Sequence, residues 1–241
     1  MKHALIVGAS GDIGIETAKQ LAAQGWSLYL HYNQQNEKIT KLITKLHAKY
    51  PKQDFLSFSF DMSTATNLDK FLENIFELDT IIFAQGTTTY KLLVQTTKEE
   101  IQHLWSMQVA VPIEIIKALQ EKLAKSSHGR IIFVGSVYGA VGSAMEVSYS
   151  MVKGAQTAFA NAYAKEVASL GITVNVVAPG AVDTHMNQFL AKNERQAITD
   201  DIPTGKFATP ADIAFWIVQL TNQAASYMTG QTIYVDGGWL K

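Results

Sequence analysis

The sequence predicts a single doubly wound α/β domain of Rossmann type, with about seven parallel strands and helices on both faces. Short apolar segments, typical of fully buried strands, alternate along the whole chain with longer segments of helical periodicity. A glycine-rich turn over residues 8–14 joins the first apolar segment to the first helical one. No linker, low-complexity tract or repeat interrupts the 241 residues, so we expect one domain over residues 1–241.

The first half of the chain alternates strands and helices in order. Gly25 ends the first helix, and the second strand runs from Trp26 to Tyr32. Thr97 and Glu100 form a capping box that opens a long helix, which Pro112 should kink. The expected strands are 4–7, 26–32, 55–60 and 80–84, and the expected helices are 13–23, 37–49, 66–76 and 97–124.

The second half continues the pattern. A strand over 131–134 precedes a helix that contains Tyr149 and ends at Gly171. Thr209-Pro210, a capping residue followed by proline, begins the last helix. The other expected elements are strands 172–177 and 231–235 and a loop and helix over 183–202.

The composition excludes several classes of function. The net charge is −1, and acidic and basic residues are mixed, so neither nucleic acid nor an anionic membrane is an expected partner. The chain has no cysteine, which excludes disulfides, thiolate catalysis and zinc–thiolate sites, and we expect no metal. No apolar run is long enough for a signal peptide or a membrane span, so we expect a cytoplasmic protein.

The glycine-rich turn has the features of a phosphate-binding loop. Glycines allow a sharp bend and a close approach of the backbone to a ligand. The helix behind them offers free N–H groups and a positive dipole end to a pyrophosphate. Asp12 is unexpected there, because a carboxylate repels phosphates unless it turns back to cap the helix.

The end of the second strand bears on the choice of cofactor. In dinucleotide folds an acidic residue there holds the ribose hydroxyls. Here Tyr32 and Asn33 occupy the position, and no acid is present to repel a 2′-phosphate. No Arg or Lys follows directly to bind that phosphate, so the sequence only favours NADP(H) over NAD(H).

Tyr149 and Lys153 are four residues apart and lie on one face of a helix. An ammonium beside a phenol lowers the phenol pKa, which would let Tyr149 act as a general acid near neutral pH. The alternative is a packed ring beside a solvated amine. Residues at the ends of several strands favour the first interpretation, because ligands bind at that edge of a parallel sheet: Gly8, Asp61, Gly86, Ser136 and Gly180.

These residues, in this order, resemble the short-chain dehydrogenases/reductases along essentially the whole chain. The motifs are the turn at residues 8–14, Asp61, Ser136 thirteen positions before Tyr149, the Tyr149-x-x-x-Lys153 pair, and segments 175–180 and 229–238. Within the family the chain resembles the 3-oxoacyl-carrier-protein reductases. Segments 146–151, 179–184 and 201–203 look most like a related group, the elongation factor P 5-aminopentanone reductases.

The resemblance implies roles for individual residues. Tyr149 would give its proton to a substrate carbonyl, Ser136 would hydrogen-bond the same oxygen, and Lys153 would hold the nicotinamide ribose and depress the Tyr149 pKa. Thr184 and Val182 would meet the carboxamide, and Asp61 with Met62 the adenine. The full set of implied cofactor residues is Gly8, Ser10, Gly11, Asp12, Ile13, Gly14, Tyr32, Asn33, Asp61, Met62, Gln85, Gly86, Tyr149, Lys153, Pro179, Gly180, Val182 and Thr184.

Three positions depart from the family pattern. Asp12 stands where a glycine is usual, and Phe83-Ala84-Gln85-Gly86 replaces a motif whose Asn commonly braces the central strands. Gln108 stands where many members carry an Asn thought to hold a proton-relay water. Glutamine offers the same amide on a longer arm, so we expect an altered relay.

The substrate implied by the resemblance is a ketone, which a protein or carrier could hold. Ser127 and Leu170 stand where carrier-protein reductases commonly present Arg, which weakens capture of an acidic carrier. Glu146, and the acids near a lid expected over residues 183–205, would suit a cationic substrate such as an aminoketone. These acids are Asp183, Glu194, Asp200 and Asp201, and the alternative is that they form only a solvated surface.

Three functions are therefore open. The first is an NADPH-dependent ketoreductase, a homotetramer by family resemblance, that acts on 5-aminopentanone-modified elongation factor P. The second is a 3-oxoacyl-carrier-protein reductase. The third, of another class, is a non-catalytic NADP-binding sensor or scaffold, which the retention of Ser136, Tyr149 and Lys153 disfavours.

Overall fold

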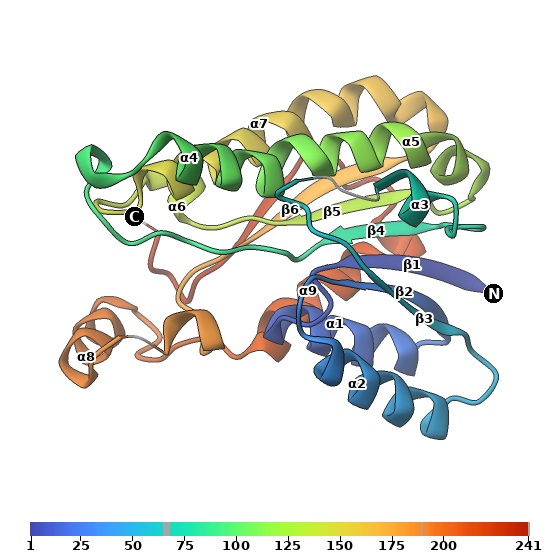
Figure 1. Cartoon of the computed structure of the whole chain (residues 1–241), viewed down its shortest axis with the longest axis horizontal. Coiled ribbons are helices and arrows are strands. Elements are labelled where there is room, and N and C mark those ends of the chain that lie inside the picture. The colour runs from blue at the N-terminus through green and yellow to red at the C-terminus, as the bar shows by residue number, and fades with distance from the viewer. Residues whose placement is uncertain (65–67, 189, 241) are drawn as a thin grey trace.

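The seven strands form one parallel sheet, which confirms the predicted fold class (Figure 1). The computed structural model describes residues 1–64, 68–188 and 190–240. The strand order is β3-β2-β1-β4-β5-β6-β7, that of a doubly wound sheet. The strands are β1 Lys2–Val7, β2 Trp26–Tyr32, β3 Phe55–Ser59, β4 Thr80–Phe83, β5 Arg130–Val134, β6 Thr173–Pro179 and β7 Thr232–Val235.

Helices cover both faces of the sheet (Figure 1). One face is covered by α1 Asp12–Ala23, α2 Asn36–Lys49 and α9 Pro210–Leu220. The other is covered by α3 Leu68–Leu72, α4 Lys98–Trp105, α5 Val111–Lys125 and α7 Val147–Val167. Two short helices, α6 Tyr138–Val141 and α8 Lys192–Asp201, lie toward the carboxyl ends of the strands.

Because both faces are covered, the inner strands β4, β5 and β6 bury all of their side chains, whereas the edge strands β3 and β7 leave several side chains partly or fully exposed. In β1, Leu5 and Val7 belong to the core beneath α5 and α7, whereas Ala4 and Ile6 belong to the core above α1 and α9. A strand buried on both sides needs an uninterrupted apolar run, and such runs are what the sequence offers.

The strand order reverses between β1 and β4, which are neighbours in the sheet although five elements separate them in the chain. Their carboxyl ends lead into Gly8 and Gln85. A Cβ on Gly8 would lie 2.5 Å from the Gln85 backbone nitrogen, and Gly8 has φ +81°. Only glycine permits this approach, and ligands of such sheets bind at this switch point.

The predicted helix over 97–124 is divided into three parts. The Thr97–Glu100 capping box is present, as predicted, and α4 runs to Trp105. A π-helical turn, Ser106–Ala110, separates α4 from α5. Pro112 therefore interrupts the helix as expected, but through a π turn in the residues before it.

Other boundaries differ by a few residues. Residues 68–72 form α3 within the helix expected over 66–76, and residues 65–67 are outside the described chain. Among the described helices, no helix is long and apolar enough to cross a membrane.

Candidate active site

A cavity of about 790 Å³ opens at the carboxyl ends of the strands. Most of the predicted site residues line it, and the exceptions are Gly14, Tyr32 and Gln108. The predicted residues in its wall are Gly8, Ser10, Gly11, Asp12, Ile13, Asn33, Asp61, Met62, Gln85, Gly86, Ser136, Glu146, Tyr149, Lys153, Pro179, Gly180, Val182 and Thr184. Gly14 lies behind the glycine turn, and Tyr32 donates its hydroxyl to Asn36 Oδ1 at 2.9 Å.

The glycine turn is packed by backbone contacts. A Cβ on Gly14 would lie 2.4 Å from the Gly8 carbonyl oxygen, so α1 approaches the turn more closely than any side chain allows. Gly11 is the N-cap of α1 and has ordinary space for a Cβ, with its nearest neighbour at 3.5 Å. The first N–H groups of an α-helix have no carbonyl partner within the helix. The start of α1 lies in the cavity wall, so these N–H groups are available to an anion bound there.

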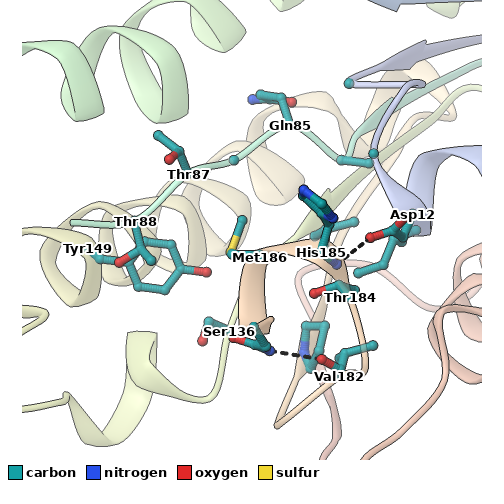
Figure 2. A pocket seen from close by; sticks show the side chains of 18 of the residues that line it. Asp12, Gln85, Thr87, Thr88, Ser136, Tyr149, Val182, Thr184, His185 and Met186 are labelled. Carbon is teal, nitrogen blue, oxygen red and sulfur yellow. Dashed lines mark hydrogen bonds between the residues drawn. The ribbon is translucent and has the colours of Figure 1, made fainter. Parts of the chain in front are cut away.

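Asp12 does not cap α1, so the capping alternative that the sequence left open does not hold. Its Oδ2 accepts a hydrogen bond from the backbone N–H of His185, 2.7 Å away (Figure 2). His185 begins a short 3-10 helix in the segment predicted as a lid. The carboxylate turns toward an N–H that would otherwise be free at that helix start, and the lid segment is thereby tied to the turn.

His31 is a functional residue that the sequence reasoning missed. It lies in β2, is 2 % exposed, and accepts a hydrogen bond from the Gly8 N–H at Nδ1, 3.2 Å away. Its Nε2 donates to the Phe60 carbonyl at 3.0 Å. Burial lowers the His31 pKa to about 4, so the neutral ring braces the turn. A polar side chain within an apolar strand was the signal that could have identified it.

The adenosine end of the cavity offers polar groups from two strand ends. Asp61 accepts hydrogen bonds from the Ser63 hydroxyl and N–H at 2.7 and 2.8 Å, and these bonds lower the pKa of its carboxyl group. Lys38, in the first turn of α2, lines the cavity beside Asn33. The sequence showed no cation for a 2′-phosphate, because Lys38 is six residues beyond the strand end at Tyr32 and only the helix brings it back to the cavity.

The catalytic candidates meet on one side of the cavity. Ser136 follows β5, and Tyr149 projects from α7 into the cavity near it (Figure 2). The Ser136 side chain is near enough to the phenol to lower the Tyr149 pKa. Lys153, one turn further along α7, places Nζ 5.5 Å from the centre of the Tyr149 ring.

The predicted lowering of the Tyr149 pKa is wrong for this structure. Burial raises that pKa, the negative charge of Glu146 raises it further, and the nearby Ser136 side chain lowers it by less. Burial also lowers the Lys153 pKa to about 7, so the amine is a weaker cation than the sequence implied. Tyr149 therefore keeps its proton at neutral pH.

Three acceptors surround the Lys153 ammonium. It donates to the Val134 carbonyl at 2.8 Å, to Gln108 Oε1 at 3.1 Å and to Gln156 Oε1 at 3.3 Å. Gln108 is fully buried and does not line the cavity, so it contacts the Lys153 ammonium from the side away from the cavity. The sequence did not single out Gln156.

The cavity wall also combines one carboxylate with apolar side chains. Glu146 Oε1 accepts a hydrogen bond from Thr88 at 2.7 Å. The apolar side chains come mainly from the segment after β6: Met186, Leu190, Ile198 and Phe207. The other acids named from the sequence, Asp183, Glu194, Asp200 and Asp201, do not line the cavity. Three of them have partners elsewhere: Asp183 pairs with Arg195 at 3.1 Å, Glu194 accepts from the Ala191 N–H, and Asp200 accepts from Gln196.

Residues 180–182 and 184, which follow β6, form part of the cavity wall. Gly180 has no space for a Cβ, which would lie 2.9 Å from the Asp236 Cα, and Val182 pairs with Ala208 in an isolated bridge. Thr184 follows at the cavity wall. Residue 189 is outside the described chain, and the lid over 183–205 remains a prediction.

The cavity fits a dinucleotide. The glycine turn forms a cradle that a Cβ would fill, α1 offers unpaired N–H groups, and polar side chains stand at both ends. At one part of its wall, the cavity presents the Tyr149 phenol, the Ser136 hydroxyl and the Lys153 amine. This geometry can protonate a carbonyl oxygen as its carbon is reduced.

Comparisons with known proteins agree with this geometry. Residues 8–240 match the family model described as "Enoyl-(Acyl carrier protein) reductase". The chain is 38 % identical over 239 residues to the uncharacterized oxidoreductase YmfI of Bacillus subtilis, covering 99 % of this chain and 98 % of that one. It is 32 % identical over 237 residues to the 3-oxoacyl-[acyl-carrier-protein] reductase FabG of Escherichia coli, covering 98 % and 96 %. The solved structure of the angucycline C-6 ketoreductase LanV with bound NADP is similar at a TM-score of 0.92 and 25 % identity, covering 99 % and 95 %.

Proposed function

The chain belongs to the short-chain dehydrogenase/reductase family and is an NAD(P)-dependent ketoreductase, and from that premise we propose that it uses NADPH to reduce a ketone that bears an amine. The observation that carries the reductase assignment is the meeting of Ser136, Tyr149 and Lys153 beside the glycine turn.

Each of the three side chains has a part in the reduction. A bound nicotinamide supplies the hydride that reaches the carbonyl carbon. Tyr149, still protonated at neutral pH, gives its proton to the carbonyl oxygen, and the Ser136 hydroxyl donates a hydrogen bond to that oxygen. Lys153 would stabilise the phenolate that Tyr149 becomes and would be the residue that holds the nicotinamide ribose.

The preference for NADPH is supported by two features of the adenosine end. Residues 33–36, which follow β2 directly, include no acid to repel a 2′-phosphate, and the Lys38 side chain lies on the cavity wall whereas that of Glu37 does not. We expect Lys38→Met to raise the dissociation constant of NADPH about tenfold and leave that of NADH within twofold, since only NADPH carries the extra phosphate. Titration of both cofactors tests this, and Lys41→Met, one turn further along α2, is the matched control. An equal change for both cofactors would contradict the preference.

The amine on the substrate is supported by Glu146. Its charge raises the Tyr149 pKa, so the carboxylate is electrostatically close to the reacting oxygen, and the Thr88 hydroxyl holds it in place. A cationic amine a few bonds from the ketone would pair with it. The 5-aminopentanone group on modified elongation factor P has this chemistry, and the resemblance of residues 146–151 points to the same substrate.

The second candidate substrate is a 3-oxoacyl chain on a carrier protein. The apolar side chains of Met186, Leu190 and Phe207 would suit an acyl chain, and the Escherichia coli relative carries that activity in its name.

Turnover with the two substrates decides between them. We expect ketone-dependent NADPH oxidation with 5-aminopentanone-modified elongation factor P to exceed that with acetoacetyl-carrier protein. Glu146→Gln should raise KM for the cationic substrate at least tenfold and leave the acyl substrate within threefold. Preference for the acyl substrate would overturn the amine proposal. Tight NADPH binding without turnover of any ketone would instead favour a sensor or scaffold.

We also propose a homotetramer, on family resemblance. Trp105 and Met151, both more than 40 % exposed, line one shallow hollow between α4 and α7. Light scattering of the purified protein measures the mass directly, and a monomer of 26.5 kDa would contradict the proposal.

A further inference from the structure

Three buried glutamines gather behind Lys153. Gln85, Gln108 and Gln156 are 8, 0 and 2 % exposed, and they come from the end of β4, the π-helical turn and α7. A buried amide is costly unless its hydrogen-bonding groups find partners. The partners of these three amides show what the cluster does.

The π-helical turn and Pro112 remove the α-helical partners of two backbone carbonyls. In an α-helix the Met107 carbonyl takes the N–H of Val111, but that N–H is bonded to the Ser106 carbonyl here. The Gln108 carbonyl would take the N–H of Pro112, which has none. Both carbonyls lie in the interior and need other donors.

Glutamine side chains supply those donors. Gln85 Nε2 donates to the Met107 carbonyl at 3.1 Å, and Gln156 Nε2 donates to the Gln108 carbonyl at 2.7 Å. The Gln156 amide reaches further, because the same Nε2 lies 3.2 Å from Gln108 Oε1. Both hydrogens of the Gln156 amide therefore bind Gln108.

The oxygen of the same amide faces the ammonium. Gln156 Oε1 accepts from Lys153 Nζ at 3.3 Å, and Gln108 Oε1 accepts from it at 3.1 Å. Only one orientation of the Gln156 amide meets both demands, since its nitrogen must face the carbonyl and its oxygen the ammonium. A single side chain thus joins the interrupted helix to the candidate catalytic lysine.

We propose that Gln156 is a positioning residue of the reductase site, which fixes the Lys153 ammonium beside Tyr149 by bridging it to the carbonyl that Pro112 leaves free. The inference rests on the proposed function. Gln156 lies beneath the site and touches neither the cavity nor a ligand that fills it. It sets how far the amine remains charged, because an acceptor facing an ammonium favours the protonated form.

Few titratable groups surround this end of α7. The helix itself carries Glu146 and Tyr149, α6 brings Tyr138, and α4 brings His103. Strand β6, which packs against α7, has no titratable side chain. Burial is the cause that lowers the Lys153 pKa to about 7. The amide oxygens of Gln108 and Gln156 and the Val134 carbonyl accept hydrogen bonds from the ammonium, and they oppose this lowering of the pKa.

The test compares two substitutions of Gln156 with opposite expected effects. Gln156→Leu removes an acceptor and should move the Lys153 titration midpoint down by about one pH unit. Gln156→Glu puts a carboxylate beside the ammonium and should move the midpoint up. The midpoint is followed by NMR of lysine labelled at 13Cε, with Lys153→Met to assign the resonance. The alkaline limb of the pH profile of kcat/KM should shift in the same two directions.

Gln120→Met is the matched control. Gln120 on α5 accepts a hydrogen bond from Tyr163 on α7 at 2.6 Å, so this variant also loses a glutamine hydrogen bond to α7, but one remote from Lys153 in the chain. We expect it to lower thermal stability without moving the Lys153 midpoint. Unchanged midpoints in both folded Gln156 variants, or equal shifts in the control, would overturn the positioning role. The NMR titration needs no ketone, so it stands even if the reductase proposal fails.

Discussion

The two ends of the cavity are held in place by different means. At the phosphate end, backbone packs on backbone: Gly14 presses α1 onto the Gly8 carbonyl, and the His31 ring braces the Gly8 N–H. At the catalytic end, the amides of Gln108 and Gln156 surround the lysine. The first end is encoded mostly within a few neighbouring residues, whereas the second joins side chains 48 positions apart.

The largest effect should come from filling the glycine cradle. Gly14→Ala places a Cβ 2.4 Å from the Gly8 carbonyl oxygen, and backbone cannot move aside easily. We expect a loss of about 3 kcal/mol or more in the free energy of unfolding and at least tenfold weaker NADPH binding. Chemical denaturation and cofactor titration measure the two losses.

Gly11→Ala is the control in the same turn. The nearest atom to its Cβ would be 3.5 Å away, which is an ordinary contact. We expect a change within about 1 kcal/mol. Similar losses in both variants would show that the turn is sensitive to any side chain, not to the close approach of α1.

His31 should make the phosphate end sensitive to acid. Its pKa is about 4 in the folded protein and 6.5 in the unfolded chain, so the unfolded state binds the proton first as the pH falls. The stability due to the neutral ring is complete above pH 6.5 and is lost between pH 6.5 and 4, by about 2 kcal/mol at pH 5. Urea unfolding at pH 7.5 and pH 5 measures it.

His31→Asn keeps an acceptor for the Gly8 N–H but cannot titrate. We expect this variant to lose about 2 kcal/mol less than the wild type between pH 7.5 and pH 5. The same acid sensitivity in both proteins would place the titrating group elsewhere.

Gln85 tests the catalytic end independently of Lys153. Gln85→Met removes the donor to the Met107 carbonyl and leaves that carbonyl buried without a partner. We expect a loss of about 1–2 kcal/mol in the free energy of unfolding, measured by denaturation. An unchanged stability would mean that the π-helical turn repairs itself, for example by returning to α-helical bonding.

The smallest effect should come from Asp12, whose contact lies near the surface. Asp12→Ala removes the acceptor of the His185 N–H. We expect less than about 1 kcal/mol of global destabilisation but at least fivefold faster hydrogen exchange at the His185 amide. Exchange that stays equally slow would show that Asp12 does not tie the lid segment to the turn.

The fold was predictable because the relevant signals are local. Trp26–Tyr32 is a strand with the predicted bounds, since its apolar run is bracketed by Gly25 and a polar stretch. Thr97 and Thr209 begin their helices as predicted, because a capping box needs residues only three positions apart.

Parts of the site were not predictable because they depend on distant residues. The π-helical turn depends on Gln85 and Gln156 to take the carbonyls that it frees. The Tyr149 pKa depends on burial and on Glu146, not on the spacing to Lys153 alone. Asp12 finds its partner 173 residues away in the chain, so no local pattern could have shown that it does not cap α1.

Tyr149→Phe tests the central claim, that the phenol beside Ser136 supplies the proton. The account predicts that ketone-dependent NADPH oxidation falls at least a thousandfold, while the dissociation constant of NADPH stays within threefold because the ring remains in place. Turnover within tenfold of the wild type would contradict it.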